Sequence, residues 1–155
     1  MEKEEALNRF SSSRQTLFDA IVGLSESDFT GPQVEGIWTI KDLLGHITAW
    51  EQTLREPLRV FSTGGPFVSQ VVSDGEAWNL EQGSRRSSWS ISEIRNDMEI
   101  TRQDLLDELQ KLSKEQWGTA FLAPWGDSNT VTEMISGLAW HEEEHTKSIL
   151  KFLAK

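Results

Sequence analysis

Two histidines lie one helical turn apart near the end of the sequence. The run His141-Glu142-Glu143-Glu144-His145 satisfies the pattern H-E-x-x-H, in which zinc proteases hold a metal with the histidines and activate water with the glutamate. Three interpretations are open from this run alone. It is a protease helix, a different kind of metal site, or a charged stretch that happens to contain two histidines.

The chain has three histidines in total, and the third is His46. On a helical wheel, His141 and His145 fall in one narrow arc with the apolar residues of their helix, which are Met134, Leu138, Ile149 and Phe152. His46 lies beside the apolar residues Leu43, Ile47 and Trp50 of its own helix. We therefore expect all three imidazoles to face the interior.

Such an arrangement suits a metal ion. Histidines at i and i+4 have Cβ atoms about 6 Å apart, so two ring nitrogens can reach one metal at roughly 2.1 Å. A third imidazole from a facing helix gives a His₃ set, which leaves a position open for water or substrate, as in catalytic zinc sites. The alternative is a polar seam in which carboxylates satisfy each ring. Three inward imidazoles without a shared partner would carry a large desolvation cost, and this favours the metal at His46, His141 and His145.

The protease interpretation does not fit the rest of the sequence. In zincins the third ligand usually lies well downstream of the second histidine, but the ten residues after His145 contain no His, Asp or Glu. The match to H-E-x-x-H is therefore expected to be accidental. Glu142 and Glu144 flank the histidine stripe and are candidates to accept an imidazole N–H, as is Asp42, whereas Glu143 is expected on a solvated face.

Helical spacing of apolar residues runs through nearly the whole chain and must position these histidines. We predict helices over residues 3–24, from Thr39 towards Phe61, from Ser90 to Leu112, and from Thr130 to the last residue. Capping boxes mark three of the starts: Thr39 with Asp42, Ser90 with Glu93, and Thr130 with Glu133. Pro57 should kink or end the second helix.

The connections complete the predicted architecture. Residues 64–89 are too long for a tight turn and are expected to cross the length of a bundle, with a short helix near 74–82. A short helical turn is expected after Ser113, and no strand-like alternation persists. The sequence thus predicts an all-α, single-domain protein over residues 1–155, a four-helix bundle with a long crossover between helices 2 and 3.

The composition of the chain narrows the classes of partner and of side-chain chemistry that are expected. The chain of 155 residues has a net charge of −10, which argues against nucleic acid and anionic membranes as partners, and leaves a small molecule or another protein. Cysteine and tyrosine are absent, so thiolate and phenol chemistry of the protein's own are excluded. The first residues lack a signal-type apolar core and no span is long enough for a membrane, so a cytoplasmic location is expected.

The stretch WTIKDLLGHITAWE (residues 38–51), with His46, and the pair His141 and His145 in the last helix resemble the DinB/YfiT-like superfamily. The resemblance spans essentially the whole chain. It implies an up-down-down-up bundle, a divalent metal, zinc or nickel, held by His46, His141 and His145, and a tendency to form homodimers. Relatives of this kind include thiol-dependent transferases and isomerases, and hydrolase-like members.

Two function hypotheses follow. In the first, the protein is a metalloenzyme, a transferase or hydrolase, whose metal activates water or a small-molecule thiol; the lack of cysteine fits a thiol that arrives with a cosubstrate. In the second, the metal or the histidines only staple helices, and the bundle binds a small molecule or partner without turnover. The crossover residues Trp78, Trp89, Arg85 and Arg86 are placed to border a pocket, where the arginines would meet an anionic substrate unless they are simply solvated.

Overall fold

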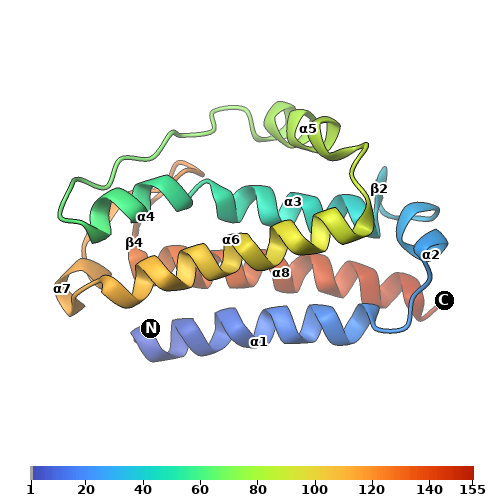
Figure 1. Cartoon of the computed structure of the whole chain (residues 1–155), viewed down its shortest axis with the longest axis horizontal. Helices are drawn as coiled ribbons and strands as arrows, with labels where there is room; N and C mark the ends of the chain where they lie inside the picture. The colour runs from blue at the N-terminus through green and yellow to red at the C-terminus, as the bar shows by residue number, and fades with distance from the viewer. Residues whose placement is uncertain (1) are drawn as a thin grey trace.

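The computed structural model describes residues 2–155 and shows a four-helix bundle (Figure 1). Its long helices are α1 (Lys3–Ile21), α3 (Ile40–Gln52) with its continuation α4 (Arg55–Ser62), α6 (Ile91–Lys111) and α8 (Val131–Leu153). Figure 1 shows α1 and α8 running in one direction, and α3 and α6 in the other. The predicted four-helix bundle with up-down-down-up order is confirmed.

The predicted capping boxes start the helices that bear or support the histidines. At α3, α6 and α8 the cap hydroxyl accepts from the backbone N–H three residues later, and the acidic side chain there accepts from the backbone N–H of the cap residue. Each box satisfies two N–H groups that a helix start otherwise leaves unpaired. The pairs Thr39 with Asp42 and Thr130 with Glu133 therefore fix where the two histidine-bearing helices begin. Asp42 has this capping role and no recorded contact with an imidazole.

The second long helix is interrupted ahead of Pro57. Helix α3 ends at Gln52, and α4 begins at Arg55 and holds Pro57 in its first turn. A proline ring clashes with the carbonyl four residues earlier, but its missing N–H costs nothing in the first turn of a helix. Pro57 therefore explains why the helix breaks between α3 and α4, about one turn before the proline.

The connections contain more structure than the sequence indicated. Helices α5 (Gly75–Arg86) and α7 (Lys114–Trp117) lie where short helices were expected, and a further short helix, α2 (Glu26–Thr30), follows α1. Two small antiparallel sheets pair β1 (Gln33–Glu35) with β2 (Trp38–Thr39), and β3 (Ala120–Leu122) with β4 (Ser128–Thr130). The expectation of no strands was wrong because strands of two or three residues are too short to show alternation.

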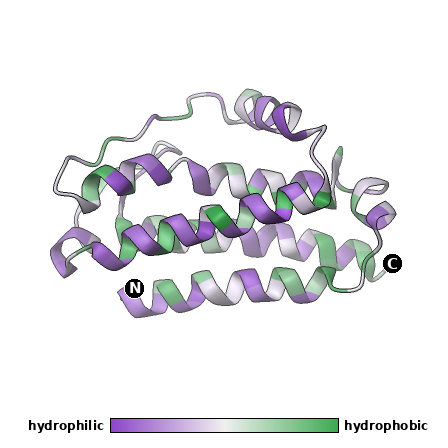
Figure 2. Ribbon diagram, in the orientation of Figure 1, coloured by the Kyte–Doolittle hydropathy of each residue, from purple (hydrophilic) through white to green (hydrophobic). Residues whose placement is uncertain are grey.

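The core divides into two apolar clusters along the bundle. One gathers side chains from α1, α4, α6 and α8 near the α7 end. The other gathers side chains from α1, α2, α3, α6 and α8 near the β1–β2 hairpin. Figure 2 shows apolar and polar positions mixed along each long helix, as amphipathic helices require. Among the described residues, no helix is both long and apolar enough to cross a membrane.

Candidate metal centre

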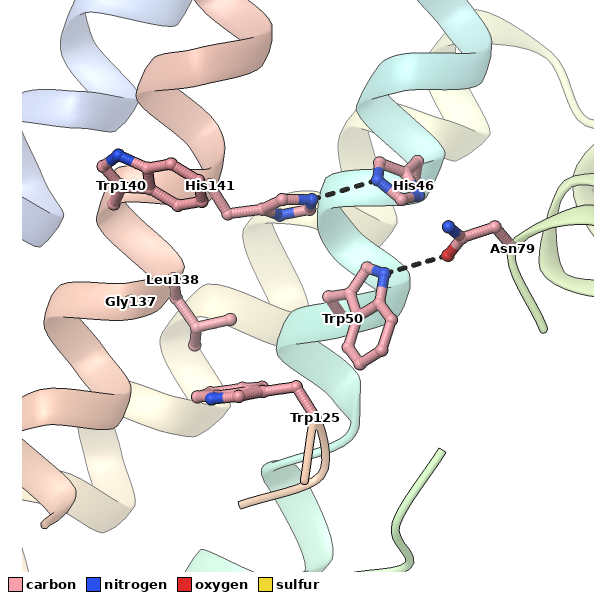
Figure 3. Close-up of a pocket in the computed structure, with 8 residues that line it drawn as sticks. All are labelled: His46, Trp50, Asn79, Trp125, Gly137, Leu138, Trp140 and His141. Carbon is pink, nitrogen blue, oxygen red and sulfur yellow. Dashed lines mark hydrogen bonds between the residues drawn. The ribbon is translucent and has the colours of Figure 1, made fainter. Parts of the chain in front are cut away.

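The three histidines converge between α3 and α8. Nε2 of His141 lies 3.0 Å from Nε2 of His46 and 3.1 Å from Nε2 of His145. Each of the three residues offers a ring nitrogen, and these nitrogens all lie within 4.8 Å of one another. Figure 3 shows His46 and His141 pointing toward each other from the two helices. The expectation that the rings face inward and meet is confirmed.

The β1–β2 hairpin adds two residues to the histidine cluster that the sequence did not reveal. Nδ1 of His145 lies 3.0 Å from Oε1 of Glu35, and the ring of Trp38 stands edge-on to His46 at 5.1 Å between centroids. Between them, Gly36 has a φ of +58°, a left-handed conformation that glycine adopts freely and that lets the chain turn back within two residues. This glycine was the one sequence signal that could have indicated a hairpin here.

The donor set fits a metal cation. Because a carboxylate only accepts, the contact with Glu35 places the proton of His145 on Nδ1 and leaves the lone pair on Nε2. The same Nε2 faces the Nε2 of His141, which in turn faces that of His46. One ring nitrogen has a single hydrogen or a single lone pair in the ring plane, so the Nε2 of His141 cannot satisfy both neighbours with good geometry. A shared cation satisfies all three lone pairs at once.

The electrostatics keep these rings in the form that binds metals. Burial lowers the pKa of His46 to about 3, and the rings of His141 and His145 lower it further. Burial and the ring of His145 also lower the pKa of His141 to about 4, although Glu35 acts in the opposite direction. Both rings are therefore neutral near pH 7, and metal binding there requires no proton to leave them.

Glu142 takes no part in the imidazole cluster. Its carboxylate is fully buried on the other side of α8, where it accepts from Nε of Arg14 at 2.6 Å and from Oγ of Ser13 at 2.7 Å. It also accepts from Nη2 of Arg102 at 3.3 Å. The role considered for Glu142 from the sequence, accepting an imidazole N–H, is therefore wrong.

A second carboxylate, that of Glu51, completes this buried ionic cluster. It is 1% exposed and accepts from Nη2 of Arg14 at 2.8 Å and from Nε and Nη2 of Arg102 at 3.0 and 2.9 Å. The cluster of Arg14, Glu51, Arg102 and Glu142 joins α1, α3, α6 and α8 and carries two charges of each sign. It ties α3 to α8 next to the histidines that these helices carry.

The remaining glutamates of the HEEEH run point outward. Glu143 is half-buried and forms a two-pronged pair with Arg9 of α1, at 2.9 and 3.0 Å from Nε, so the solvated face expected for it is only partly correct. Glu144 pairs with Lys147 one turn later at 2.9 Å. Neither contacts an imidazole among the described residues.

A cavity of about 380 Å³ opens beside the histidines (Figure 3). Helix α3 contributes His46 and Trp50, and α5 contributes Asn79. The rest of the lining is Trp125 from the β3–β4 connection and Gly137, Leu138, Trp140 and His141 from α8. Nε1 of Trp50 donates to Oδ1 of Asn79 at 3.0 Å, and Nε1 of Trp125 donates to Oδ1 of Asn129 at 2.9 Å.

The crossover residues expected at the pocket lie elsewhere. Trp78 packs on the outer side of Trp50 with 4.4 Å between ring centroids, and Arg85 pairs with Glu81 in solvent. Arg86 is buried between α3, α5 and α6, where Nη2 donates to Oε1 of Gln52 at 2.8 Å, and it lies over the ring of Trp89. None of these four is among the lining residues of the cavity.

A four-helix bundle with three converging histidines on its second and last long helices defines the class of this protein. The chain belongs to the DinB superfamily, whose family model matches residues 5–149. It is 22% identical over 146 residues to a protein of Oceanobacillus iheyensis that bears the name "Putative metal-dependent hydrolase OB0413", covering 94% of this chain and 82% of that protein.

Two solved structures share the fold. A mycothiol-dependent maleylpyruvate isomerase superposes with a TM-score of 0.78 at 17% identity, over 96% of this chain; the chain spans only 61% of the isomerase. The colibactin self-resistance protein ClbS, in a complex with double-stranded DNA, superposes with a TM-score of 0.80 at 14% identity, over 99% of this chain and 96% of ClbS.

Proposed function

We propose that His46, His141 and His145 hold a divalent metal, zinc or nickel, and that the protein is an enzyme of the metal-dependent hydrolase or thiol-dependent transferase type. The observation that carries the proposal is the convergence of three Nε2 atoms, with the proton of His145 held on Nδ1 by Glu35. The name of the Oceanobacillus iheyensis relative supports a metal, and the mycothiol dependence named for the isomerase supports a thiol cosubstrate.

The bound metal would supply Lewis acidity that lowers the pKa of a water molecule or of a thiol. The protein's own residues then do the positioning. Glu35 fixes the tautomer of His145, the buried ionic cluster fixes α3 against α8, and the cavity holds a substrate against His46 and His141. The chain contains no cysteine, so a sulfur nucleophile would have to enter with a cosubstrate.

Metal analysis of protein purified without a histidine tag tests the proposal. We expect about one zinc or nickel per chain in the wild type, and loss of the metal in His46→Ala, His141→Ala and His145→Ala variants that retain helical circular dichroism. Glu144→Gln is the control, because this neighbouring carboxylate contacts only Lys147 among the described residues. Metal retained by all three alanine variants would contradict the site. Turnover of test esters and of electrophiles with small thiols would then assign the reaction class.

The second candidate is a binding protein without turnover, in which the metal staples α3 to α8. The name of ClbS, a self-resistance protein, favours a bundle that captures a harmful small molecule. Cobalt-substituted protein separates the two candidates. An open site gives a changed visible spectrum on addition of azide or a small thiol, and a closed structural site gives none.

The proposal also includes the organisation of the chain. Residues 1–155 are taken as a single domain that pairs as a homodimer. Limited proteolysis and light scattering test these two points.

A further inference from the structure

We propose that the cavity beside the histidines selects a neutral, apolar and aromatic substrate and, apart from the proposed metal, offers no partner to a carboxylate. This inference deepens the proposed function, on which it rests for the role of the cavity as a substrate site. It differs from one of the two alternatives that the sequence left open for the arginines of the crossover, which was contact with an anionic substrate.

The walls of the cavity are aromatic and apolar. Trp50 and Trp125 come from two different elements and border the cavity together with Leu138 (Figure 3), and Trp140, which is 56% exposed, lies at its margin. Two of these indoles are held in place: Trp50 by its hydrogen bond to Asn79 and Trp125 by its hydrogen bond to Asn129. Fixed indole faces stack well on planar rings, because aromatic pairs gain free energy beyond the area they bury. The volume of about 380 Å³ lies in the range of small-molecule pockets.

Gly137 keeps the floor of the cavity open. A Cβ atom placed on this glycine would stand 3.7 Å from Cζ2 of Trp125 and would meet no other atom within 4 Å. A glycine in the interior of an α-helix such as α8 costs stability relative to alanine. Here its missing side chain leaves space in front of the indole of Trp125, which is where a planar ring would fit.

The polar groups of the cavity are few and uncharged. Besides His46 and His141, the lining offers the amide of Asn79, whose Oδ1 already accepts from Trp50. Its Nδ2 makes no hydrogen bond to any described residue and is available as a donor. One donor suits one acceptor oxygen, such as the carbonyl of an electrophilic ketone, ester or amide.

Apart from the proposed metal, a carboxylate would have no partner in this cavity. Within residues 2–155, no lysine, arginine, aspartate or glutamate belongs to the lining. The nearby cation of α5, Arg86, is turned into the bundle, where its side chain occupies the space left by the absent Cβ of Gly45, with Cδ 3.1 Å from that position. Away from the proposed metal, placing an anion among indoles without a cation costs free energy, and the net charge of −10 adds repulsion.

A matched pair of fluorescent probes tests the inference. N-phenyl-1-naphthylamine is neutral, and 1-anilinonaphthalene-8-sulfonate has the same rings with one sulfonate added. We expect the neutral probe to bind about tenfold or more tightly than the sulfonate, as followed by probe fluorescence and by energy transfer from tryptophan. Equal or tighter binding of the sulfonate in chelator-treated protein, where no metal can hold it, would overturn the proposal.

A cavity variant locates the binding. Gly137→Leu fills the floor and is expected to weaken binding of the neutral probe about tenfold, with circular dichroism and the unfolding midpoint confirming an intact fold. Gly75→Leu is the control, because it adds the same side chain where no atom lies within 4 Å and outside the cavity. Trp125→Ala is a second test of the binding place. It should weaken binding of the neutral probe about two- to tenfold, because the stacking on the indole is lost. Unchanged binding in both Gly137→Leu and Trp125→Ala would place the probe elsewhere and refute the inference.

Probe binding to metal-free protein distinguishes a failure of the metal proposal from a failure of this inference. The probe measurements are repeated on chelator-treated protein and on the His145→Ala variant, since His145 does not line the cavity. Selective binding of the neutral probe in these metal-free samples supports the cavity even if no metal is ever found. Loss of selectivity in chelator-treated protein, when the untreated protein contains its metal, counts against the cavity alone.

Discussion

Nδ1 of His145 on the last helix lies 3.0 Å from Oε1 of Glu35 on a short hairpin, although 110 residues separate them in the sequence. Carboxylates that accept from a ligand histidine commonly orient the ring and raise its basicity. Glu35 is therefore expected to act on the metal through His145.

The first prediction concerns this contact. Glu35→Ala should weaken zinc binding about 10- to 100-fold, because the ring of His145 loses the acceptor that fixes its tautomer and orientation. Glu35→Gln should lie between this variant and the wild type, since its amide oxygen still accepts the N–H but carries no charge. Competition with a chromophoric chelator measures the affinity. Glu144→Gln serves as the control, and wild-type affinity in Glu35→Ala would contradict the role.

The second prediction concerns the buried ionic cluster. Glu142→Gln should lower the free energy of unfolding by about 3–5 kcal/mol, because it leaves Arg14 and Arg102 buried with an excess of positive charge. Glu143→Gln changes a partly exposed pair with Arg9 and should cost less than about 1 kcal/mol. Urea unfolding of metal-free protein gives both values. Equal losses in the two variants would show that the cluster does not depend on its charge balance.

The third prediction is a dependence of stability on pH in metal-free protein. The folded-state pKa of His46, about 3, and that of His141, about 4, lie below the ordinary histidine value of 6.5. The unfolded chain therefore binds more protons than the folded chain between these values. The free energy of unfolding should be highest above about pH 6.5 and should fall as the pH drops from 6.5 towards 3. Chemical denaturation curves at several pH values would measure this dependence in the wild type and in a His46→Ala, His141→Ala double variant. The fall in unfolding free energy between pH 6.5 and pH 3 should be smaller in the double variant.

The fourth prediction compares two glycines in helices. A Cβ at Gly45 would stand 3.1 Å from Cδ of Arg86 and 3.5 Å from Cδ1 of Ile94, whereas a Cβ at Gly83 would meet only Trp38, at 3.8 and 3.9 Å. Gly45→Ala should therefore lower the unfolding free energy by about 1–3 kcal/mol through overpacking. Gly83→Ala should raise it by about 0.5–1 kcal/mol, because alanine favours helix. Thermal unfolding of both variants measures the difference, and stabilisation by Gly45→Ala would show that Arg86 moves aside at little cost.

Local sequence signals were enough for the framework of the fold. The hydroxyl and acidic pairs at Thr39, Ser90 and Thr130 act within four residues, so the three helix starts could be predicted from the sequence. The position of each histidine on its apolar stripe likewise depends only on helical periodicity. The helix starts and the histidine positions together predicted that the rings converge, because the apolar stripes of the four helices pack against one another.

The contacts of the site that the sequence did not predict involve residues that are far apart in the chain. Glu142 was considered as an acceptor for an imidazole N–H, because its true partners, Arg14 of α1 and Arg102 of α6, are far from it in the sequence. A sequence signal did exist, since Arg14 lies on the apolar stripe of α1 between Phe10 and Leu17. Glu35 had no such signal of its own, because a strand of three residues shows no periodicity.

The pairing of α1 with α8 has a consequence for biosynthesis. The first helix packs side by side with α8, the last to be made of the helices described (Figure 1). During translation, the apolar face of α1 therefore lacks α8, its main neighbour, until nearly all of this sequence has been made. His141 and His145 are made with α8, so insertion of the proposed metal would follow translation of these residues, and a nascent chain arrested before them would hold His46 alone.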